Sequence, residues 1–283
     1  GAGSVGGGGI YLADPASSTF TDCIISQNTA YYGAGVYFDG QTGGTVNFTD
    51  CVFSGNDSNV DDWESYGGAI YAGNVTTANN LVDSPTTPPF TMTVTNCTFD
   101  TNISPFGGAL CVDAVVLTVT DSTFTANSAE YGGGIFAYGS QVTINDKSMF
   151  EGNTAAVTLS VNVATSGGAA YLQQSDVTIA DTVFLSNTTE DTAGALAIIG
   201  LPLQDTFQTV ANCLFVDNVA GFEGGAFSAE YSAMVQVANC TFADNLVTSE
   251  YGLGGALYCF EYTFVDIWDS IFWDNNAVFG SQI

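Results

Sequence analysis

Carboxylates are the groups of this chain that could take part in chemistry. Its 283 residues include 29 Asp and Glu and no His, and Lys147 is the single basic residue, so the formal net charge is −28. Two carboxylates can hydrolyse a glycosidic bond, and carboxylates also bind calcium. Nucleic acids, anionic membranes and uronate polymers are excluded as partners, because recognising them requires cationic side chains. Cations, neutral sugars and other proteins remain.

One set of Asp and Asn residues recurs at a fixed position, just after a run of alternating β-branched residues such as Val142-x-Ile144. The alternation changes phase at this position, which predicts a bend in the left-handed conformation that Asp and Asn tolerate. Capping of the bend amides is one role for these side chains. Calcium bridging of neighbouring carboxylates, with Asp22 and Asp50 as the candidate ligands, is the other, and no further cofactor is expected. The positions are Asp22, Asp50, Asn96, Asp121, Asp146, Asp181, Asn212, Asn239 and Asp269.

These bends belong to a unit that repeats nine times. Each unit contains a Gly-Gly-Ala-aliphatic block, such as residues 67–70, and an apolar-x-x-Asn block, such as residues 99–102. The return from Asn to the next glycines is too short for a helix, so the units predict a parallel β-helix, a stack of three-strand coils. Identical Asn side chains would then form a hydrogen-bonded ladder. Its members are Asn28, Asn56, Asn102, Asn127, Asn153, Asn187, Asn218, Asn245 and Asn275.

The paired blocks resemble the repeats of the chlamydial polymorphic outer-membrane proteins, whose signatures are Gly-Gly-Ala-[Ile/Leu/Val] and Phe-x-x-Asn. The resemblance covers nearly the whole chain and implies a right-handed β-helix displayed at a cell surface, where it would act in adhesion. The near-total lack of basic residues departs from that family. The expected fold class is therefore all-β: a right-handed single-stranded parallel β-helix, or solenoid, of about nine to ten coils, forming one domain over residues 1–283.

A column of aromatic residues is expected on the outside of the first strand of each coil. Six rings in one column could stack on neutral sugars or pack against a partner. Alternatively, the rings are there because aromatic residues favour strands and support one another in the stack. The residues are Tyr11, Tyr37, Tyr71, Phe136, Tyr171 and Tyr258.

Cysteines and sequons suggest covalent features. Five of the seven Cys follow the bend, so neighbouring coils bring Cys23 near Cys51 and Cys213 near Cys240, at a separation that suits disulfides. A stack of inert buried thiols is the alternative. Among the Asn-x-Ser/Thr sequons, Asn47 and Asn74 lie off the two ladders and are the expected glycan carriers if the source is eukaryotic.

The predicted function is a non-enzymatic extracellular rod, structural or adhesive, that is displayed on a surface or builds a filament. Its partners would be copies of itself or another surface protein, bound through open coil ends or the aromatic column, together with neutral glycans. The block at residues 280–283 starts a further repeat, which suggests a fragment of, or a subunit within, a larger extracellular assembly. A carbohydrate-binding or glycosidase-type secreted β-helix is the alternative. No non-repeating carboxylate cluster is apparent on a strand, so no catalytic residue is predicted.

Overall fold

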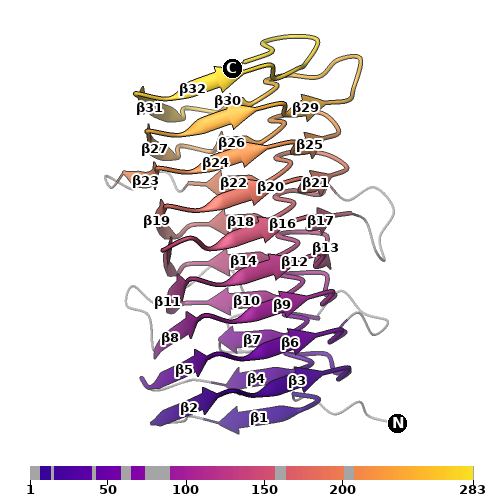
Figure 1. The fold of residues 1–283 in the computed structure, drawn as a ribbon, viewed down its shortest axis with the longest axis vertical. Coiled ribbons are helices and arrows are strands. Elements are labelled where there is room, and N and C mark those ends of the chain that lie inside the picture. The colour runs from indigo at the N-terminus through magenta and orange to yellow at the C-terminus, as the bar shows by residue number, and fades with distance from the viewer. Residues whose placement is uncertain are drawn as a thin grey trace.

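The computed structural model describes residues 7–13, 16–39, 43–58, 65–73, 90–156, 164–200 and 207–282. Within these ranges the chain forms strands and no helix, arranged as three nine-stranded sheets and one five-stranded sheet. Every strand pairs in parallel with its counterpart one repeat away, so nine coils stack along the long axis of the molecule (Figure 1). The predicted parallel β-helix is confirmed. None of the described segments is a helix that could cross a membrane.

The first strand of each coil belongs to sheet A and follows the Gly-rich block. Sheet A contains β1 (Ile10–Ala13), β4 (Val36–Asp39), β7 (Ile70–Gly73), β10 (Leu110–Asp113), β14 (Ile135–Tyr138), β18 (Ala170–Gln173), β22 (Leu196–Ile199), β26 (Phe227–Glu230) and β30 (Leu257–Phe260). The alternating β-branched runs form sheet B. Its strands are β2 (Ser17–Thr21), β5 (Thr45–Thr49), β8 (Phe90–Thr95), β11 (Val115–Thr120), β15 (Gln141–Asn145), β19 (Asp176–Ala180), β23 (Gln208–Ala211), β27 (Met234–Ala238) and β31 (Phe264–Trp268).

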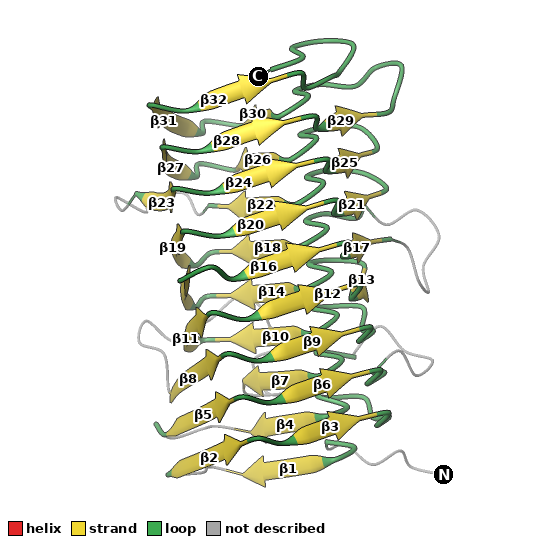
Figure 2. Cartoon of the chain, in the orientation of Figure 1, coloured by secondary structure: helices red, strands yellow, loops and turns green. Residues whose placement is uncertain are grey.

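Short strands around the repeated Phe form sheet C, and two-residue strands after the ladder Asn form sheet D (Figure 2). Sheet C contains β3 (Ile24–Ser26), β6 (Val52–Ser54), β9 (Thr98–Asp100), β12 (Thr123–Thr125), β16 (Met149–Glu151), β20 (Val183–Leu185), β24 (Leu214–Val216), β28 (Thr241–Ala243) and β32 (Ile271–Trp273). Sheet D contains β13 (Ser128–Ala129), β17 (Thr154–Ala155), β21 (Thr188–Thr189), β25 (Val219–Ala220) and β29 (Leu246–Val247).

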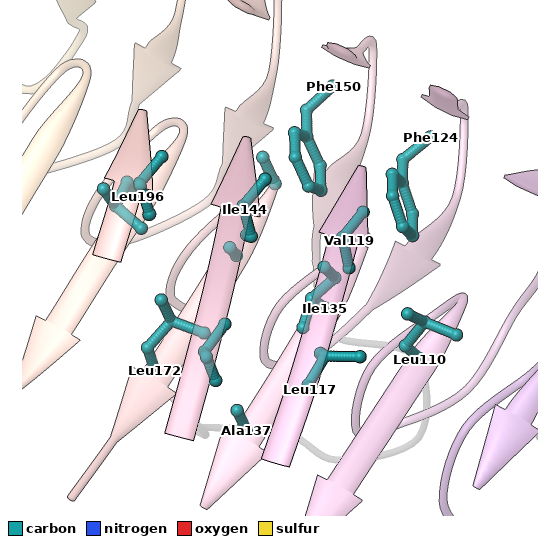
Figure 3. Packing of buried hydrophobic residues seen from close by; sticks show 14 of the residues in the cluster. Leu110, Leu117, Val119, Phe124, Ile135, Ala137, Ile144, Phe150, Leu172 and Leu196 are labelled. Carbon is teal, nitrogen blue, oxygen red and sulfur yellow. The ribbon is translucent and has the colours of Figure 1, made fainter. Parts of the chain in front are cut away.

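The core is a column of apolar side chains enclosed by sheets A, B and C. Phe124 and Phe150 lie side by side in Figure 3, with Val119 of sheet B and Ile135 of sheet A beside them. Successive Phe rings from Phe53 to Phe272 stack with centroids 4.6–5.2 Å apart and planes within 10° of parallel. Because stacked rings at the coil spacing gain contact without distortion, one Phe per coil fills the core at this level.

The predicted bend between sheets B and C is confirmed. All nine Asp and Asn residues there have positive φ, between 46° and 55°. A second left-handed residue comes just before each ladder Asn, for example Thr101, Ala126 and Ser186. The sequence predicted a turn at the Asn but not this residue, because its type varies from coil to coil.

The ladder Asn is also confirmed, and its carboxamide uses all of its hydrogen-bonding capacity. Asn127 Nδ2 donates to Asn153 Oδ1 and to the Phe99 carbonyl, each at 3.0 Å. Asn127 Oδ1 accepts from the Nδ2 and the backbone N–H of Asn102, each at 2.9 Å. The side chain is fully buried. Each Asn therefore fixes the position of its coil relative to the coils on both sides.

The glycine block forms a corner where the backbones of successive coils nearly touch. A Cβ on Gly133 would lie 2.2 Å from the carbonyl oxygen of Gly168 in the next coil. No side chain fits in that space, which explains why this residue of the block is Gly in most coils.

Replacing the central ladder residue, Asn127→Ala, should lower the free energy of unfolding by about 3 kcal/mol or more. The change leaves the Asn102 N–H buried without its partner, at about 1–3 kcal/mol, and removes one hydrogen bond each from Asn102 Nδ2, Asn153 Oδ1 and the Phe99 carbonyl, at about 0.5–1.5 kcal/mol each. Chemical denaturation measures the loss. The control is Asn47→Ala, on the outer face of sheet B, where we expect a change below about 0.5 kcal/mol. Equal losses in the two variants would contradict the role given to the ladder.

Candidate functional site

The predicted aromatic column lies on the outer face of sheet A, away from the main core. The expectation that it is exposed was wrong for its central members, since Tyr37, Tyr71 and Phe136 have only 2%, 0% and 4% of their surface exposed. Tyr11, in the first coil, is half exposed, and Tyr171 and Tyr258 are partly buried. These three central members of the column therefore cannot stack on a sugar.

A second aromatic column explains this burial. The residue before each glycine block is aromatic in four successive coils, and these residues pair along the rod in parallel bridges. Tyr66 packs on Tyr71 with ring centroids 5.5 Å apart, and Phe106 packs on Phe136 at 5.3 Å. The two columns interlock to form the outer aromatic cluster, a second small core outside the coils. Its buried members are Tyr32, Tyr37, Tyr66, Tyr71, Cys111, Phe136 and Tyr138.

Tyr71 is the most deeply buried ring of the outer aromatic cluster. Its hydroxyl is buried and has no hydrogen-bond partner. Burial, followed by the neighbouring Cys111 and Asp113, raises the pKa of this phenol well above its ordinary value. The hydroxyl therefore stays neutral and costs stability, since it gives up its bond to water without replacement.

The aromatic column is interrupted in the C-terminal half, where Ala197 and Ser228 occupy its positions. Three carboxylates lie in this region: Asp191, Glu223 and Glu230, here called the carboxylate cluster. Ser228 Oγ donates to Glu230 Oε1 at 2.9 Å, and Thr192 Oγ1 donates to Glu223 Oε2 at 3.3 Å.

Burial and neighbouring charges shift pKa values in and beside the carboxylate cluster. Burial raises the pKa of Glu230, and the charges of Glu223 and Asp191 raise it further, while the Ser228 hydrogen bond opposes both. Burial also raises the pKa of Asp191. Burial and the Glu223 charge raise the pKa of Tyr258 to about 12. Two neighbouring carboxyl groups, one of them with a raised pKa, are the residue types that an acid–base pair uses.

The carboxylate cluster was not predicted from the sequence. Catalytic carboxylates were expected on strands, but only Glu230 lies on one, at the end of β26. Glu223 and Asp191 come from the corner before the glycine block, and the bridge between Thr192 and Glu223 stacks these corners. A corner position that is aromatic in coils two to five and acidic in coil eight was the available signal.

Large apolar side chains point outward from sheet C in three of the last four coils. Parallel register places them in two columns, one through Val183, Leu214 and Ile271 and one through Leu185, Val216 and Trp273. β28 contributes the smaller Thr241 and Ala243 to these columns. Leu214, Ile271 and Trp273 are 37%, 57% and 68% exposed, and the rest are partly buried. The six large apolar residues are here called the apolar strip. No described element covers β20, β24, β28 or β32 (Figure 2).

One of the two columns is polar nearer the N-terminus. Ser26, Ser54, Asp100, Thr125 and Glu151 occupy the positions that Leu185, Val216 and Trp273 take in later coils. The other column is mixed there, with Ile24, Val52, Thr98, Thr123 and Met149. Because both halves share one backbone, the apolar strip is a property of the side chains and not of the fold.

Comparison with known families agrees with this architecture. The family described as "Right handed beta helix region" matches residues 3–84 and 86–267. The chain belongs to this family. The match covers most of the chain and gives the hand of the solenoid, as predicted. It does not extend to the narrower resemblance to polymorphic outer-membrane proteins. No curated protein and no solved structure matches the chain.

The cysteines of this β-helix are all free thiols. The predicted pairs Cys23–Cys51 and Cys213–Cys240 are not bonded, and Cys51, Cys213 and Cys240 are buried. Cys51 Sγ donates to the Thr49 carbonyl at 3.2 Å, as Ser122 Oγ does to Thr120 at 2.9 Å. The backbone N–H of the preceding coil in turn donates to Cys240 Sγ or to Ser122 Oγ. The thiols therefore take the hydrogen-bonding place of a hydroxyl after the bend, which corresponds to the alternative of a buried thiol stack.

The remaining predicted sites are the calcium ligands Asp22 and Asp50 and the glycan carriers Asn47 and Asn74. Asp22 and Asp50 are exposed, and Asp50 Oδ1 accepts a short hydrogen bond from Asn96 Nδ2. Across the described ranges, no three His, Cys, Asp or Glu side chains are arranged to hold a metal ion. Calcium bridging stays a prediction. Asn47 points outward from β5 and is partly exposed, whereas Asn74 lies outside the described residues.

Tyr71→Phe should raise the free energy of unfolding by about 1 kcal/mol, because it removes a buried hydroxyl that has no partner. Tyr71→Ser should lower it by about 3 kcal/mol or more, since the ring is fully buried. Thermal and urea unfolding of both variants test this. Tyr11→Phe, at the half-exposed end of the column, is the control and should change little. A Tyr71→Ser variant as stable as the wild type would show that the ring does not support the fold.

The carboxylate cluster should make stability depend on pH. Because the pKa values of Glu230 and Asp191 are raised on folding, the folded state holds protons that the unfolded state has released. The stabilisation of the folded state by these bound protons is fully present below the ordinary carboxyl pKa, about 4. It is lost as the pH rises through the pKa values that the two carboxyls have in the folded protein. Glu230→Gln should therefore flatten the fall in melting temperature between pH 4.5 and 7. The exposed Glu250→Gln is the control, and an unchanged slope in Glu230→Gln would refute the assignment.

Proposed function

We propose that this β-helix is a non-enzymatic extracellular rod that binds a partner through the outer face of sheet C. The observation that carries the proposal is the apolar strip. Its side chains point away from the core, so the fold gains little from them. An exposed apolar patch that continues over several coils is a feature of binding surfaces.

The rod supplies a stiff support for such a face. The Asn ladder and the Phe stack run through the coils without a break, and each fixes the distance between neighbouring coils. Side chains on the outer face are therefore held at about 4.8 Å from coil to coil. A partner meets a preorganised surface and loses less entropy on binding than it would with a mobile loop. The extracellular setting is supported by the resemblance of the repeats to those of surface proteins and by the accessible sequon at Asn47.

A carbohydrate-active role is a second candidate, and the carboxylate cluster favours it. Glu230, whose pKa is raised, would be the proton donor, and Glu223 or Asp191 would be the partner carboxylate. Tyr171 and Tyr258 lie on either side of the interruption in the column, where they would stack on a neutral sugar. The absence of cationic subsites restricts the substrate to neutral glycans.

An assay for reducing ends on neutral polysaccharides separates the two candidates. We expect the purified protein to release no sugar from glucans, mannans or xylans, and Glu230→Gln to behave identically. Hydrolysis by the wild type that disappears in Glu230→Gln but persists in Glu250→Gln would overturn the non-enzymatic proposal and establish the second candidate.

A further inference from the structure

We infer that the partner of the apolar strip is a basic amphipathic helix that lies along the rod axis. The inference rests on the proposed function, because it assigns the chemistry of the partner that the outer face of sheet C would bind. Three properties of the apolar strip support this inference: the charges beside the strip, the pairing of the sheet C strands that carry it, and the dimensions of the strip.

Carboxylates border the apolar strip on both long sides. Asp217, Asp244 and Asp274 follow β24, β28 and β32 and are exposed. On the other side, the bend places Asp181 and Asp269 at the surface, with Asn212 and Asn239 between them. An apolar surface with a row of carboxylates on one side and a carboxylate at each end of the other side is complementary to an apolar surface flanked by Lys or Arg.

The same charges argue against a second copy of this chain as the occupant. With one basic residue and a net charge of −28, a copy has no cations with which to meet the carboxylates beside the strip. Self-association through the strip would bring rows of carboxylates together without compensation, which is unfavourable at close range. The partner must therefore supply the positive charge.

An added β-strand is excluded at the centre of the strip. β24 and β28 are hydrogen-bonded on both edges, β24 to β20 and β28 and β28 to β24 and β32. Their main-chain groups are already paired, so recognition there must use side chains. A helix satisfies its own backbone hydrogen bonds and can pack its side chains on such a face.

The dimensions of the strip suit a helix. Its two columns are two residues apart on each strand, about 6.6 Å, which is the width of one apolar helix face. Four coils at about 4.8 Å span about 14 Å, the length of about ten helical residues. Residues three and four apart on a helix are about 5–6 Å apart, close to the coil spacing, so flanking Lys side chains can follow the rows of carboxylates.

Peptide binding tests the inference. The probe is a synthetic helix of about 14 residues with Leu on one face and Lys on both flanks, and its control is the same peptide with Glu in place of Lys. The protein is used as the wild type and as the strip variant Leu185→Ser/Leu214→Thr/Val216→Thr, which imports residue types found on the N-terminal half of the same face. Ile24→Ser, which removes a more exposed apolar residue from the same face of sheet C in the first coil, is the control. Asp217→Asn/Asp244→Asn tests the acidic border and keeps residue types that tolerate positive φ.

We expect the Leu/Lys peptide to bind the wild type and Ile24→Ser equally, and the strip variant at least about tenfold more weakly. The border variant should bind more weakly and with a shallower dependence on salt, and the Leu/Glu peptide should not bind. Circular dichroism and melting temperature establish that each variant is folded. If the strip variant does not fold, the exposed border pair decides the result.

Equal binding of the Leu/Lys peptide to the wild type and the strip variant would overturn the inference, because attraction to the acidic rod as a whole would then explain it. Binding of both peptides would overturn the assignment of a basic partner. Absence of binding to the wild type would overturn the inference completely. None of these outcomes alters the hydrolysis assay, so failure of the partner assignment is distinguishable from failure of the proposed function.

Discussion

The hydrogen bonding of one carboxamide per coil is the constraint on which the rest of this structure depends. Within the stack, each ladder Asn bonds to the Asn on either side and to two backbone groups of the preceding coil, which for Asn127 are the Asn102 N–H and the Phe99 carbonyl. The turn between sheets C and D therefore has the same shape in every coil. An identical turn places the preceding aromatic at an identical depth, so the rings of Phe124 and Phe150 stack almost parallel. In the first coil Ile25 replaces Phe. The Ile25 carbonyl still accepts a hydrogen bond from Asn56 Nδ2, because this bond does not depend on the side chain at position 25.

The acidity of the protein follows in part from its backbone geometry. Left-handed residues occur at the bend between sheets B and C and again before the ladder Asn, and Asp fills many of these positions. Asp tolerates positive φ and its side chain points into water there, as at Asp121 and Asp244. The residues that shape the coil therefore also charge its surface. The carboxylates on one side of sheet C are the outer side of the turns that hold the Asn ladder, and those on the other side are the outer side of the bends between sheets B and C.

The sequence predicts the features that depend on repetition and misses those that depend on contact between different positions of the repeat. The bend at Asp146 and the ladder at Asn127 recur at the same place in every repeat, so the interpretation of one repeat applies to all of them. The burial of Tyr71 depends on a second column, at Tyr66, which has no fixed residue type along the whole chain. The carboxylate cluster draws on separate coil positions, and only the stacking of coils shows that Glu230 lies near Glu223. The apolar strip is visible in the sequence only after the outward positions of sheet C are known.

The coil between Asn102 and Asn127 has a consequence for how such a molecule changes in length. The two residues are 25 positions apart and hydrogen-bond directly, so this stretch is one complete layer with no insertion. Its contacts go only to the layers immediately above and below. An in-frame duplication of these 25 codons would add a layer whose upper and lower surfaces already match, and an in-frame deletion would join two surfaces that also match. Proteins that descend from one gene can therefore differ in length by whole layers and still form all of the hydrogen bonds between layers.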